Sequence, residues 1–427
     1  MKQALMTLAI AICICMTVSA QTASPNGFRG VNRAGIYASE TGLMRQWPAE
    51  GPQLLWESLE IGKGYSSPVI VGDRLYITGM TEDEKQETFI AFSLDGKKLY
   101  TTVYGKPFNQ SYPETRTTPT IDNGKAYVIS GMGEVVCINC EDGKIIWKVD
   151  GLNTYGSKTG NWGTAECPLV YDNKVIYTPG GSQTTIVALD KETGKEIWKS
   201  KSLDDGRAYV SPTMIEWKGK YQIVASTQHV VFGVNPANGT IEWEFRDWGR
   251  PGAGRPMQGG YIPENIAPNS ALYKDGMIFF SQGYDCNAYM LKLNDTLTGV
   301  NLQWKNDDLD THHGGYVLVD GTIYGSNWLN NTSGNWCAVD WNTGKTIFNT
   351  AWKGGKGKGS TISADGMLYF YDERRGFVGL AQLGNELNIV SEFRITKGEG
   401  PYWAHLVINN GVLYVRHGSA LQAYKIK

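Results

Sequence analysis

Short runs of alternating apolar and polar residues, interrupted by tight turns, make up most of the chain. Residues 119–127 and 361–369 are two examples, and each run is broken by an Asn-Gly or Asp-Gly pair. Alternation with a period of two is typical of half-buried strands, and these pairs favour tight hairpin turns. No stretch of the chain shows a sustained helical period. The pattern therefore predicts an all-β protein.

One phrase returns along the chain. In residues 190–198 it reads Asp-Lys-Glu-Thr-Gly-Lys-Glu-Ile-Trp, which is a carboxylate, a turn around Gly, a basic residue and an apolar-Trp pair. The copies end 44 to 61 residues apart, at Tyr100, Trp147, Trp198, Trp243, Trp304, Phe348 and Phe393. Together with the alternating run that precedes it, each copy forms a unit of four short strands. Such units are typical of β-propeller blades, in which ring closure protects the sheet edges.

The units number eight when their first strands are aligned. These strands begin near Tyr65, Arg116, Glu166, Tyr209, Pro268, His313, Lys358 and Trp403. The eighth unit has no outer strand after Tyr424, whereas residues 53–57 supply an extra copy before the first unit. The sequence therefore predicts a single domain over residues 51–427. We expect an eight-bladed propeller of four-stranded antiparallel blades, with the last blade closed by the N-terminal strand.

The first 20 residues have the form of a secretory signal. A positive start at Lys2 is followed by an apolar stretch over residues 4–18 and a small-residue ending at Ala20, which predicts a signal peptide cleaved after Ala20. A membrane anchor is the alternative, but the apolar run is shorter than the ~20 residues that span a bilayer. The signal has no lipobox. We expect a periplasmic or secreted protein without a transmembrane segment in the mature chain, and residues 21–50 as an N-terminal segment.

Charge and composition narrow the function classes. Lys and Arg number 40 against 42 Asp and Glu, a net charge of −2, so no basic excess exists to neutralise a nucleic-acid backbone, and we predict no nucleic-acid partner. The 52 glycines and 11% aromatic residues suit a turn-rich fold with a large core.

Cys137 and Cys140 form a lone CxxC pair, but Cys137 aligns with Ala188 of the next unit. We interpret it as a small buried side chain and predict no metal site.

Binding residues are expected on the face that carries the connections between blades, because these connections are long and varied. Where the first strands enter the central funnel, their aligned positions form a ring. This ring contains Tyr65, Arg116, Ala165, Tyr209, Pro268, His313, Lys358 and Trp403, with Glu166 and Asn269 beside it. Two residues further on stand Ser67, Thr118, Cys167, Ser211, Ser270, Gly315, Ser360 and His405. We predict an aromatic and cationic funnel above a narrow channel lined by small side chains.

All five histidines of the chain map to this face. His312, His313 and His405 enter first strands, while His229 and His417 fall at turns between second and third strands. Imidazole titrates near neutral pH and is the commonest metal ligand, so a structural hydrogen bond and a ligand site are both open for each one. The predicted ligand-binding residues are Tyr65, Arg116, Glu166, Tyr209, His312, His313, Lys358, Trp403, His405, Arg416 and His417.

The phrase in residues 188–198, Ala-Leu-Asp-Lys-Glu-Thr-Gly-Lys-Glu-Ile-Trp, resembles the tryptophan-docking repeat of pyrroloquinoline-quinone-like (PQQ-like) propellers. That superfamily includes quinoprotein alcohol dehydrogenases and the outer-membrane assembly lipoprotein of the BamB type. The resemblance covers about residues 51–427, and it is specific for fold and weak for function. It implies that the Trp of each phrase packs between blades.

The quinoprotein members of the superfamily imply particular cofactors. They combine the quinone with calcium or a lanthanide held by carboxylate and amide ligands, and carry a vicinal disulfide beside it. The chain has no adjacent Cys pair. Glu166 has only Asn265 or Asn269 as candidate co-ligands. The cofactor is therefore unknown, and PQQ with calcium is disfavoured.

Three functions remain open. The first is a propeller that binds, and as an enzyme acts on, a polar glycan-like or anionic small ligand in the funnel, because aromatic faces suit sugar rings and cations suit acidic groups. The second is a PQQ-dependent alcohol or sugar dehydrogenase, and the third is a non-catalytic envelope scaffold of the BamB type with a protein partner. If the first is an enzyme, the candidate bases are His313 and His405, the candidate proton donors are Tyr65 and Tyr209, and Arg116 stabilises negative charge.

Overall fold

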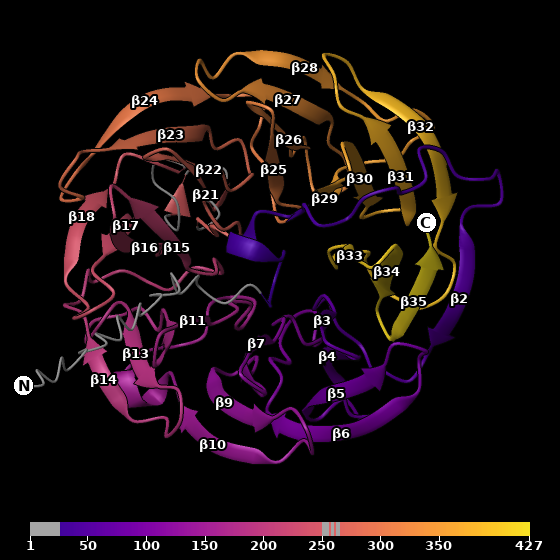
Figure 1. Ribbon diagram of the computed structural model, residues 1–427. Helices are drawn as coiled ribbons and strands as arrows, with labels where there is room; N and C mark the ends of the chain where they lie inside the picture. The colour runs from indigo at the N-terminus through magenta and orange to yellow at the C-terminus, as the bar shows by residue number, and fades with distance from the viewer. Residues whose placement is uncertain (1–25, 250–255, 258–259, 262–264) are drawn as a thin grey trace, which may run out of the picture.

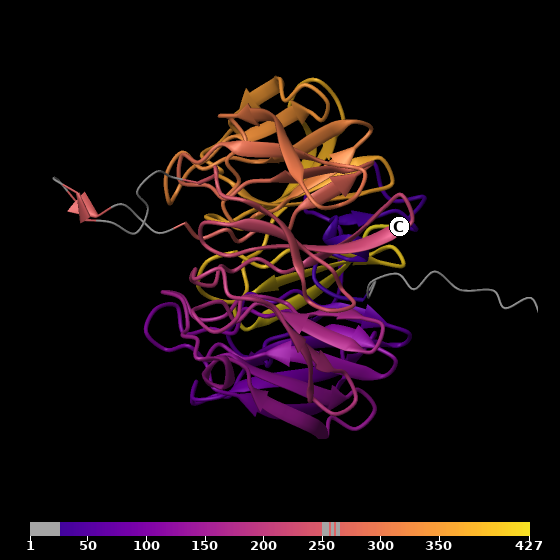
Figure 2. The same ribbon diagram turned by 90° about the vertical axis from the view of Figure 1, so that its left-hand side faces the viewer.

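Eight antiparallel sheets are arranged around a central axis in the computed structural model (Figure 1). The structure describes residues 26–249, 256–257, 260–261 and 265–427, so the predicted signal peptide and its cleavage site lie outside the described residues. Seen from the side, the ring is thinner than it is wide (Figure 2). The prediction of an all-β, eight-bladed propeller is confirmed.

The first four blades are sheets of consecutive strands. Blades 1 and 2 contain β3 (Val69–Val71), β4 (Arg74–Met80), β5 (Glu87–Ser93), β6 (Lys98–Gly105), β7 (Thr120–Asp122), β8 (Lys125–Ile129), β9 (Glu134–Asn139) and β10 (Ile145–Asp150). Blades 3 and 4 contain β11 (Leu169–Tyr171), β12 (Lys174–Tyr177), β13 (Val187–Asp190), β14 (Glu196–Lys199), β15 (Thr213–Trp217), β16 (Lys220–Ser226), β17 (Val231–Val234) and β18 (Ile241–Phe245). A short 3-10 helix, η2 (Asn153–Tyr155), lies in the connection from blade 2 to blade 3.

The next three blades repeat the same order after a small hairpin, β19 (Pro256–Met257) and β20 (Gly260–Tyr261). Blades 5 and 6 contain β21 (Leu272–Lys274), β22 (Met277–Phe280), β23 (Ala288–Leu293), β24 (Val300–Asn306), β25 (Tyr316–Val319), β26 (Thr322–Ser326), β27 (Trp336–Asp340) and β28 (Thr346–Thr350). Blade 7 contains β29 (Gly359–Ala364), β30 (Met367–Asp372), β31 (Phe377–Gln382) and β32 (Asn388–Arg394). No helix of the described residues is long and apolar enough to cross a membrane.

Blade 8 joins the two ends of the propeller. Its strands β33 (Val407–Asn409), β34 (Val412–His417) and β35 (Ala420–Lys425) are completed by β2 (Gln53–Ser58). β2 runs antiparallel to β35, with Gln53 opposite Lys425 and Ser58 opposite Leu421. The predicted closure of the last blade by the N-terminal strand is therefore confirmed.

The hairpin turns between first and second strands have the predicted chemistry. Asn123 and Gly124 have φ values of 46° and 73°, and Asp365 and Gly366 have 48° and 71°. Positive φ at both central residues defines the turn that best matches the twist of paired strands, and Gly adopts it without strain.

The repeated tryptophans hold neighbouring blades together. The Trp147 indole N–H donates to Lys191 O at 3.0 Å, and that of Trp198 donates to Pro236 O at 3.1 Å. The glycine of the following phrase lies against each ring, since a Cβ at Gly194 would be 2.8 Å from the indole of Trp147. The phrase therefore pairs a Trp in one blade with a Gly in the next, which explains why both recur together.

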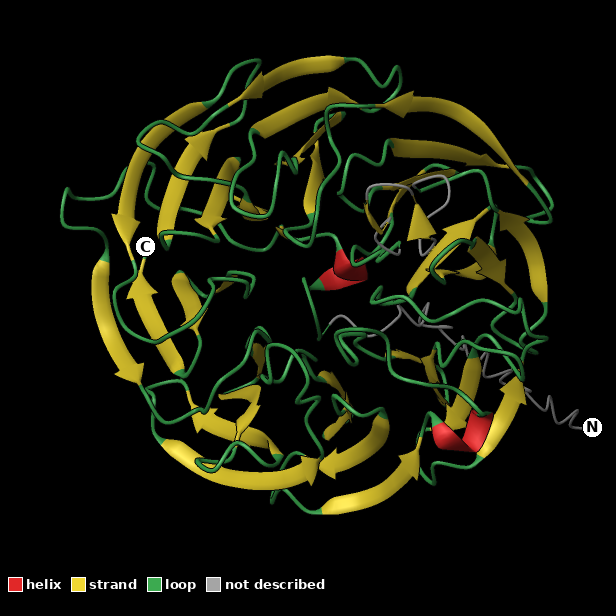
Figure 3. Ribbon diagram, turned by 180° about the vertical axis from the view of Figure 1, so that it is seen from behind, coloured by secondary structure: helices red, strands yellow, loops and turns green. Residues whose placement is uncertain are grey.

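Residues 26–37, called here the axial segment, fill one end of the central channel. The segment contains the 3-10 helix η1 (Val31–Arg33), which lies near the middle of the ring (Figures 1 and 3). It ends in β1 (Ile36–Tyr37), which pairs in parallel with β29 and gives blade 7 a fifth strand. Two buried side chains, Arg29 and Arg33, anchor the segment. The repeat pattern does not predict that the axial segment fills the channel.

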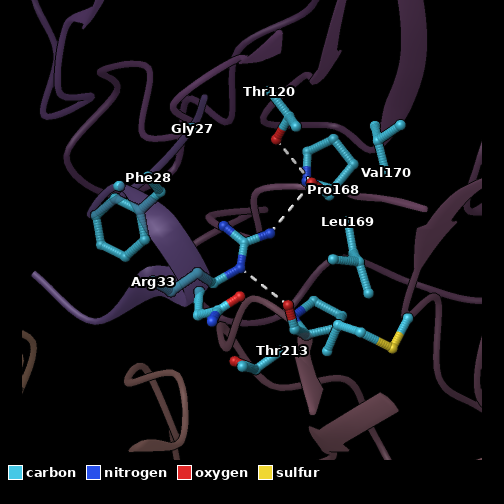
Figure 4. Close-up of a pocket in the computed structure, with 12 residues that line it drawn as sticks. Gly27, Phe28, Arg33, Thr120, Pro168, Leu169, Val170 and Thr213 are labelled. Atoms are coloured by element: carbon cyan, nitrogen blue, oxygen red, sulfur yellow. Dashed lines mark hydrogen bonds between the residues drawn. The ribbon is translucent and has the colours of Figure 1, made fainter. Parts of the chain in front are cut away.

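Backbone carbonyls of the first strands accept the hydrogen bonds of these two arginines. Arg33 donates from Nε to Pro212 O at 2.9 Å and from Nη2 to Pro168 O at 3.1 Å (Figure 4). Its Nη2 also donates to Cys167 O at 2.9 Å. Inner strands at a propeller axis have free edges, so their carbonyls need partners. The axial segment supplies those partners.

Candidate functional site

A cavity of about 390 Å³ opens at the other end of the central channel. Segments that enter the first strands and loops that join the blades form its wall. The aromatic lining residues are Phe28, Tyr65, Tyr112, Trp162, Tyr209, Tyr284 and Trp403. The charged and hydrogen-bonding lining residues include Arg116, Ser211, His312, His313, Asn331, Glu373 and His405. Concave sites with mainly apolar walls and a few polar groups are typical of small-molecule binding.

Most of the ring predicted at the funnel entrance lines this cavity. Its lining members are Tyr65, Arg116, Ala165, Tyr209, Pro268, His313 and Trp403. From the narrower ring, Cys167, Ser211 and His405 reach the cavity. The alignment of first strands thus located the wall, while the roles of these side chains in binding or catalysis stay predictions.

Trp403 lies at the centre of an aromatic cluster on one side of the cavity. Its ring centroid is 5.0 Å from that of Tyr65, 4.8 Å from that of Tyr112 and 5.1 Å from that of His313. Elsewhere on the wall, Trp162 contacts the ring of Tyr209, and its backbone N–H donates to the Tyr209 hydroxyl at 3.1 Å. These contacts fix the rings in place before any ligand arrives, which lowers the entropy cost of binding.

Arg116 fixes the loop that carries Tyr112. Its guanidinium donates to Ser111 O at 3.0 Å, to Tyr112 O at 2.7 Å and to Glu114 O at 3.1 Å. Burial lowers the pKa of Arg116, and the nearby Glu114 carboxylate works in the opposite direction. Arginine stays protonated in proteins. The cavity wall therefore carries the positive charge of Arg116, and part of its guanidinium is used in hydrogen bonds to backbone oxygens.

Lys358, predicted as a ligand-binding cation, is instead paired inside the wall. Its ammonium group bonds Glu373 Oε1 and donates to Asn331 O at 3.1 Å. The Lys358 and Glu373 side chains are only 2% and 7% exposed. Burial raises the pKa of Glu373 to about 7, although Lys358 opposes the rise. Lys358 does not line the cavity, and its predicted contact with a ligand stays a prediction.

His313 and His312 are neutral hydrogen-bonding groups. Burial, with a smaller contribution from Lys358, lowers the pKa of His313 to about 3, and its Nε2 lies 3.4 Å from Glu373 Oε2. Burial and the adjacent His313 lower the pKa of His312 well below its usual value. His312 Nδ1 has no hydrogen-bond partner among the described residues. Both rings can therefore exchange hydrogen bonds with a ligand, but neither adds positive charge near neutral pH.

Both ring nitrogens of His405 have partners within the protein. Arg29 Nη1 lies 2.8 Å from its Nδ1, and the backbone O of His313 lies 3.0 Å from its Nε2. Because a guanidinium only donates, Nδ1 must accept and Nε2 must carry the hydrogen. Burial and Arg29 lower the pKa of His405 well below its usual value. Both ring nitrogens of His405 are therefore occupied within the protein, which does not favour a general base, and the predicted role of His405 stays a prediction.

Three more predicted ligand residues lie outside the cavity wall. Glu166 is fully buried and accepts the Thr178 N–H at 2.8 Å, while Arg416 is fully buried and donates to Thr78 O at 2.7 Å. The ring nitrogens of His417 lie 2.6 Å from Lys397 O and 2.8 Å from Gly400 O. These three side chains have partners within the protein instead of facing the cavity, and their roles as ligand residues stay predictions.

Several lining residues escaped the sequence reasoning. Tyr112, Trp162 and Tyr284 come from long connections or turns outside the aligned ring, and Phe28 comes from the axial segment. Aromatic residues in otherwise polar connections were the available signal for the first three. Phe28 contacts His405 edge to face at 4.9 Å, and no repeat pattern marks it.

The fold and the central cavity define a PQQ-like β-propeller. The chain belongs to the family described as outer membrane protein assembly factor BamB, whose model matches residues 106–350. A BamB from Alkalilimnicola ehrlichii is 24% identical over 205 residues, which cover 47% of this chain and 48% of that protein. The quinoprotein alcohol dehydrogenase PedH of Pseudomonas putida is 27% identical over 139 residues, which cover 29% of this chain and 22% of that protein. The chain thus spans half or less of the length of these relatives.

Solved structures show the same fold over nearly the whole chain. BamB from Moraxella catarrhalis has a TM-score of 0.63 at 14% identity, with 88% of this chain and 99% of that one covered. A europium-containing methanol dehydrogenase also has a TM-score of 0.63, at 10% identity, with 92% of this chain and 90% of that one covered. At these identities the likeness concerns the fold alone.

The residues that could hold a quinoprotein cation do not fit that role. Glu166 forms an ion pair with Arg207 at 3.3 Å. Asn269 Nδ2 donates to Thr311 O at 2.8 Å, and its Oδ1 accepts the Gly315 N–H at 3.2 Å. Within the described ranges, no group of three His, Cys, Asp or Glu side chains is arranged to hold a metal ion. The candidate ligands are thus already occupied by protein partners.

Proposed function

We propose that the chain is a cell-envelope propeller whose cavity binds a small polar ligand that carries a flat ring. The observation that carries this proposal is the 390 Å³ cavity with seven aromatic side chains in its wall. Ligand pockets have volumes of about 300 Å³ or more. Sugar rings and aromatic rings both stack well on such side chains.

The polar groups of the wall suit a ligand with hydroxyl or acidic groups. The neutral His312 and His313 can donate or accept one hydrogen bond, depending on tautomer. Arg116 offers a charge-assisted contact at the edge of the aromatic cluster. A glycan-like compound with an acidic group matches this set. We propose binding rather than catalysis, because a histidine with a pKa of about 3 is a poor general base near neutral pH.

Thermal-shift screening of the mature protein tests the proposal. The panel contains neutral and acidic sugars, aryl glycosides, PQQ with calcium, and calcium alone. We expect a rise in Tm with a ring-bearing sugar or aryl glycoside, since a ligand that binds the native state stabilises it. A hit must also quench tryptophan fluorescence, because Trp162 and Trp403 line the cavity. A panel in which only PQQ with calcium stabilises the protein would contradict the proposal.

A non-catalytic scaffold is the second candidate. It is favoured by the family model, which matches residues 106–350. As a scaffold, the chain would bind an envelope protein and would need no ligand in the cavity. Crosslinking in intact cells separates the two proposals. The scaffold is favoured if one envelope protein is captured, if cavity variants do not change this capture, and if no compound of the ligand panel raises the Tm.

A further inference from the structure

Arg29 places a buried positive charge under the floor of the cavity. Its side chain is 5% exposed, and the neighbouring residue Phe28 lines the cavity. The guanidinium donates to Thr361 O at 2.9 Å and to Tyr316 O at 2.6 Å, and its Nη1 also contacts His405. All of these partners are neutral. Among the described residues no carboxylate forms an ion pair or hydrogen bond with Arg29.

Two glycines with positive φ leave the space that the Arg29 guanidinium occupies. Gly315 has φ of 68°, and a Cβ there would lie 2.5 Å from Arg29 Nη1 and 3.1 Å from His405 Cε1. Gly35, with φ of 69°, leaves similar space on the other side of the guanidinium. Side chains other than glycine rarely adopt these angles. Arg29 therefore occupies a built site, not an accidental position.

The charges around the cavity do not cancel. Lys358 and Glu373 neutralise each other within the wall, and Glu114 lies near Arg116. His405 cannot carry charge while its Nδ1 accepts from Arg29. Arg29 is thus left as an excess cation in a region of low dielectric. A buried charge without a counter-ion is costly, and an anion placed nearby recovers part of that cost.

We infer that the cavity selects anionic ring compounds, and that Arg29 of the axial segment is the residue that sets this charge preference. The inference rests on the proposed binding function: it narrows the ligand from hydroxyl-bearing or acidic compounds to acidic ones, and it assigns the preference to Arg29. Arg29 acts through space and through His405, as a specificity-determining residue that positions the floor of the site. The chemical class is a sugar or aryl compound with one carboxylate or sulfate group.

Two probes that differ in one carboxylate test the inference. Isothermal titration compares 4-nitrophenyl β-D-glucuronide with 4-nitrophenyl β-D-glucoside. We expect the wild-type protein to bind the glucuronide about tenfold more tightly, the order expected for one partly screened charge pair. Equal binding of both probes would overturn the charge inference and leave the proposed function standing. Binding of neither probe would overturn both.

Variants at Arg29 separate a charge effect from a structural one. Arg29→Gln is expected to reduce the preference for the glucuronide to about one, and Arg29→Lys is expected to retain it. Arg394→Gln removes an exposed charge on the outer strand β32 and is the matched control. An unchanged preference in Arg29→Gln would assign Arg29 a structural role only. If that variant does not fold, the wild-type ratio still decides the charge preference of the cavity, and loss of that preference in Arg29→Lys would overturn its assignment to Arg29.

Discussion

The two halves of the axial channel are formed by the same eight first strands but are filled differently. At one end, side chains of the strand entrances leave a cavity of about 390 Å³. At the other, the axial segment leaves about 20 Å³ beside Arg33, room for little more than a water molecule. The first half presents side chains, whereas the second presents backbone carbonyls to arginines. Variants of the cavity wall in the open half should therefore change binding, and variants at Arg33 in the filled half should change stability.

The largest effect is expected for Arg33→Ala in the filled half. The change removes three hydrogen bonds to the carbonyls of Cys167, Pro168 and Pro212 and leaves these groups unpaired. We expect the free energy of unfolding to fall by about 3–5 kcal/mol. Urea unfolding followed by far-UV circular dichroism measures it. A loss below 1 kcal/mol would show that the axial segment does not anchor the ring.

A smaller loss is expected for Gly315→Ala, at the boundary between the halves. The new methyl group would meet the Arg29 guanidinium at 2.5 Å, in a backbone conformation with φ of 68°. Strain and displacement of Arg29 should cost about 2–3 kcal/mol. Gly321→Ala is the control, because it also has positive φ (80°) but open space around its Cβ. Equal losses in both variants would attribute the effect to φ alone.

Behind the open half, Glu87→Gln should reveal a pH effect. Glu87 accepts the Tyr104 hydroxyl and the Gly131 N–H, and burial raises its pKa from 4.5 to about 7. Because the folded-state pKa is the higher one, its stabilising contribution is full below pH 4.5 and is lost as the pH rises toward 7. Glutamine stays neutral and can keep both contacts. We expect equal Tm values near pH 4.5, and a variant more stable by about 1–3 kcal/mol at pH 8. A variant less stable at pH 8 would contradict this.

Trp403→Ala is expected to have the smallest effect on folding and a clear effect on ligand binding. Trp403 contacts Tyr65, Tyr112 and His313 at the cavity wall and is only partly buried. We expect about a tenfold loss of affinity for the ring-bearing hit, with Tm changed by a few degrees at most. Trp217→Ala, on a partly buried ring outside the cavity, serves as control. Equal affinity in both variants would place the ligand elsewhere.

The propeller and most of the cavity wall could be predicted because the repeat fixes the register of each first strand. A ring position found in one blade maps to the same height in the others, which is why Tyr65, Tyr209 and Trp403 all line the cavity. Side-chain partners follow no such register. Lys358 occupies a ring position but turns to Glu373, and Arg416 turns between blades to contact Thr78. Buried charges choose the nearest satisfying partner, and a pattern of residue types does not show it.

The axial segment lay beyond the same reasoning for a different reason. Arg29 and Arg33 belong to no repeat, so their placement depends on which carbonyls the closed ring leaves unpaired. That information exists only after all eight blades are placed. Tyr112, Trp162 and Tyr284 are an intermediate case, since their loops follow the repeat in position but not in length.

The pairing of β2 with β35 has a consequence for how the molecule forms. Residues 53–58 must wait for residues 421–425 before blade 8 can be completed. Loop closure over such a distance is entropically expensive, and contacts distant in sequence slow folding. Until then, β2 is an unpaired edge that carries the exposed Leu54 and Leu55, the kind of surface that invites pairing with another chain. When β35 is synthesised late, we therefore expect β2 to pair with β35 of another copy of the chain. We expect this strand exchange more often than the unfolding of any single blade.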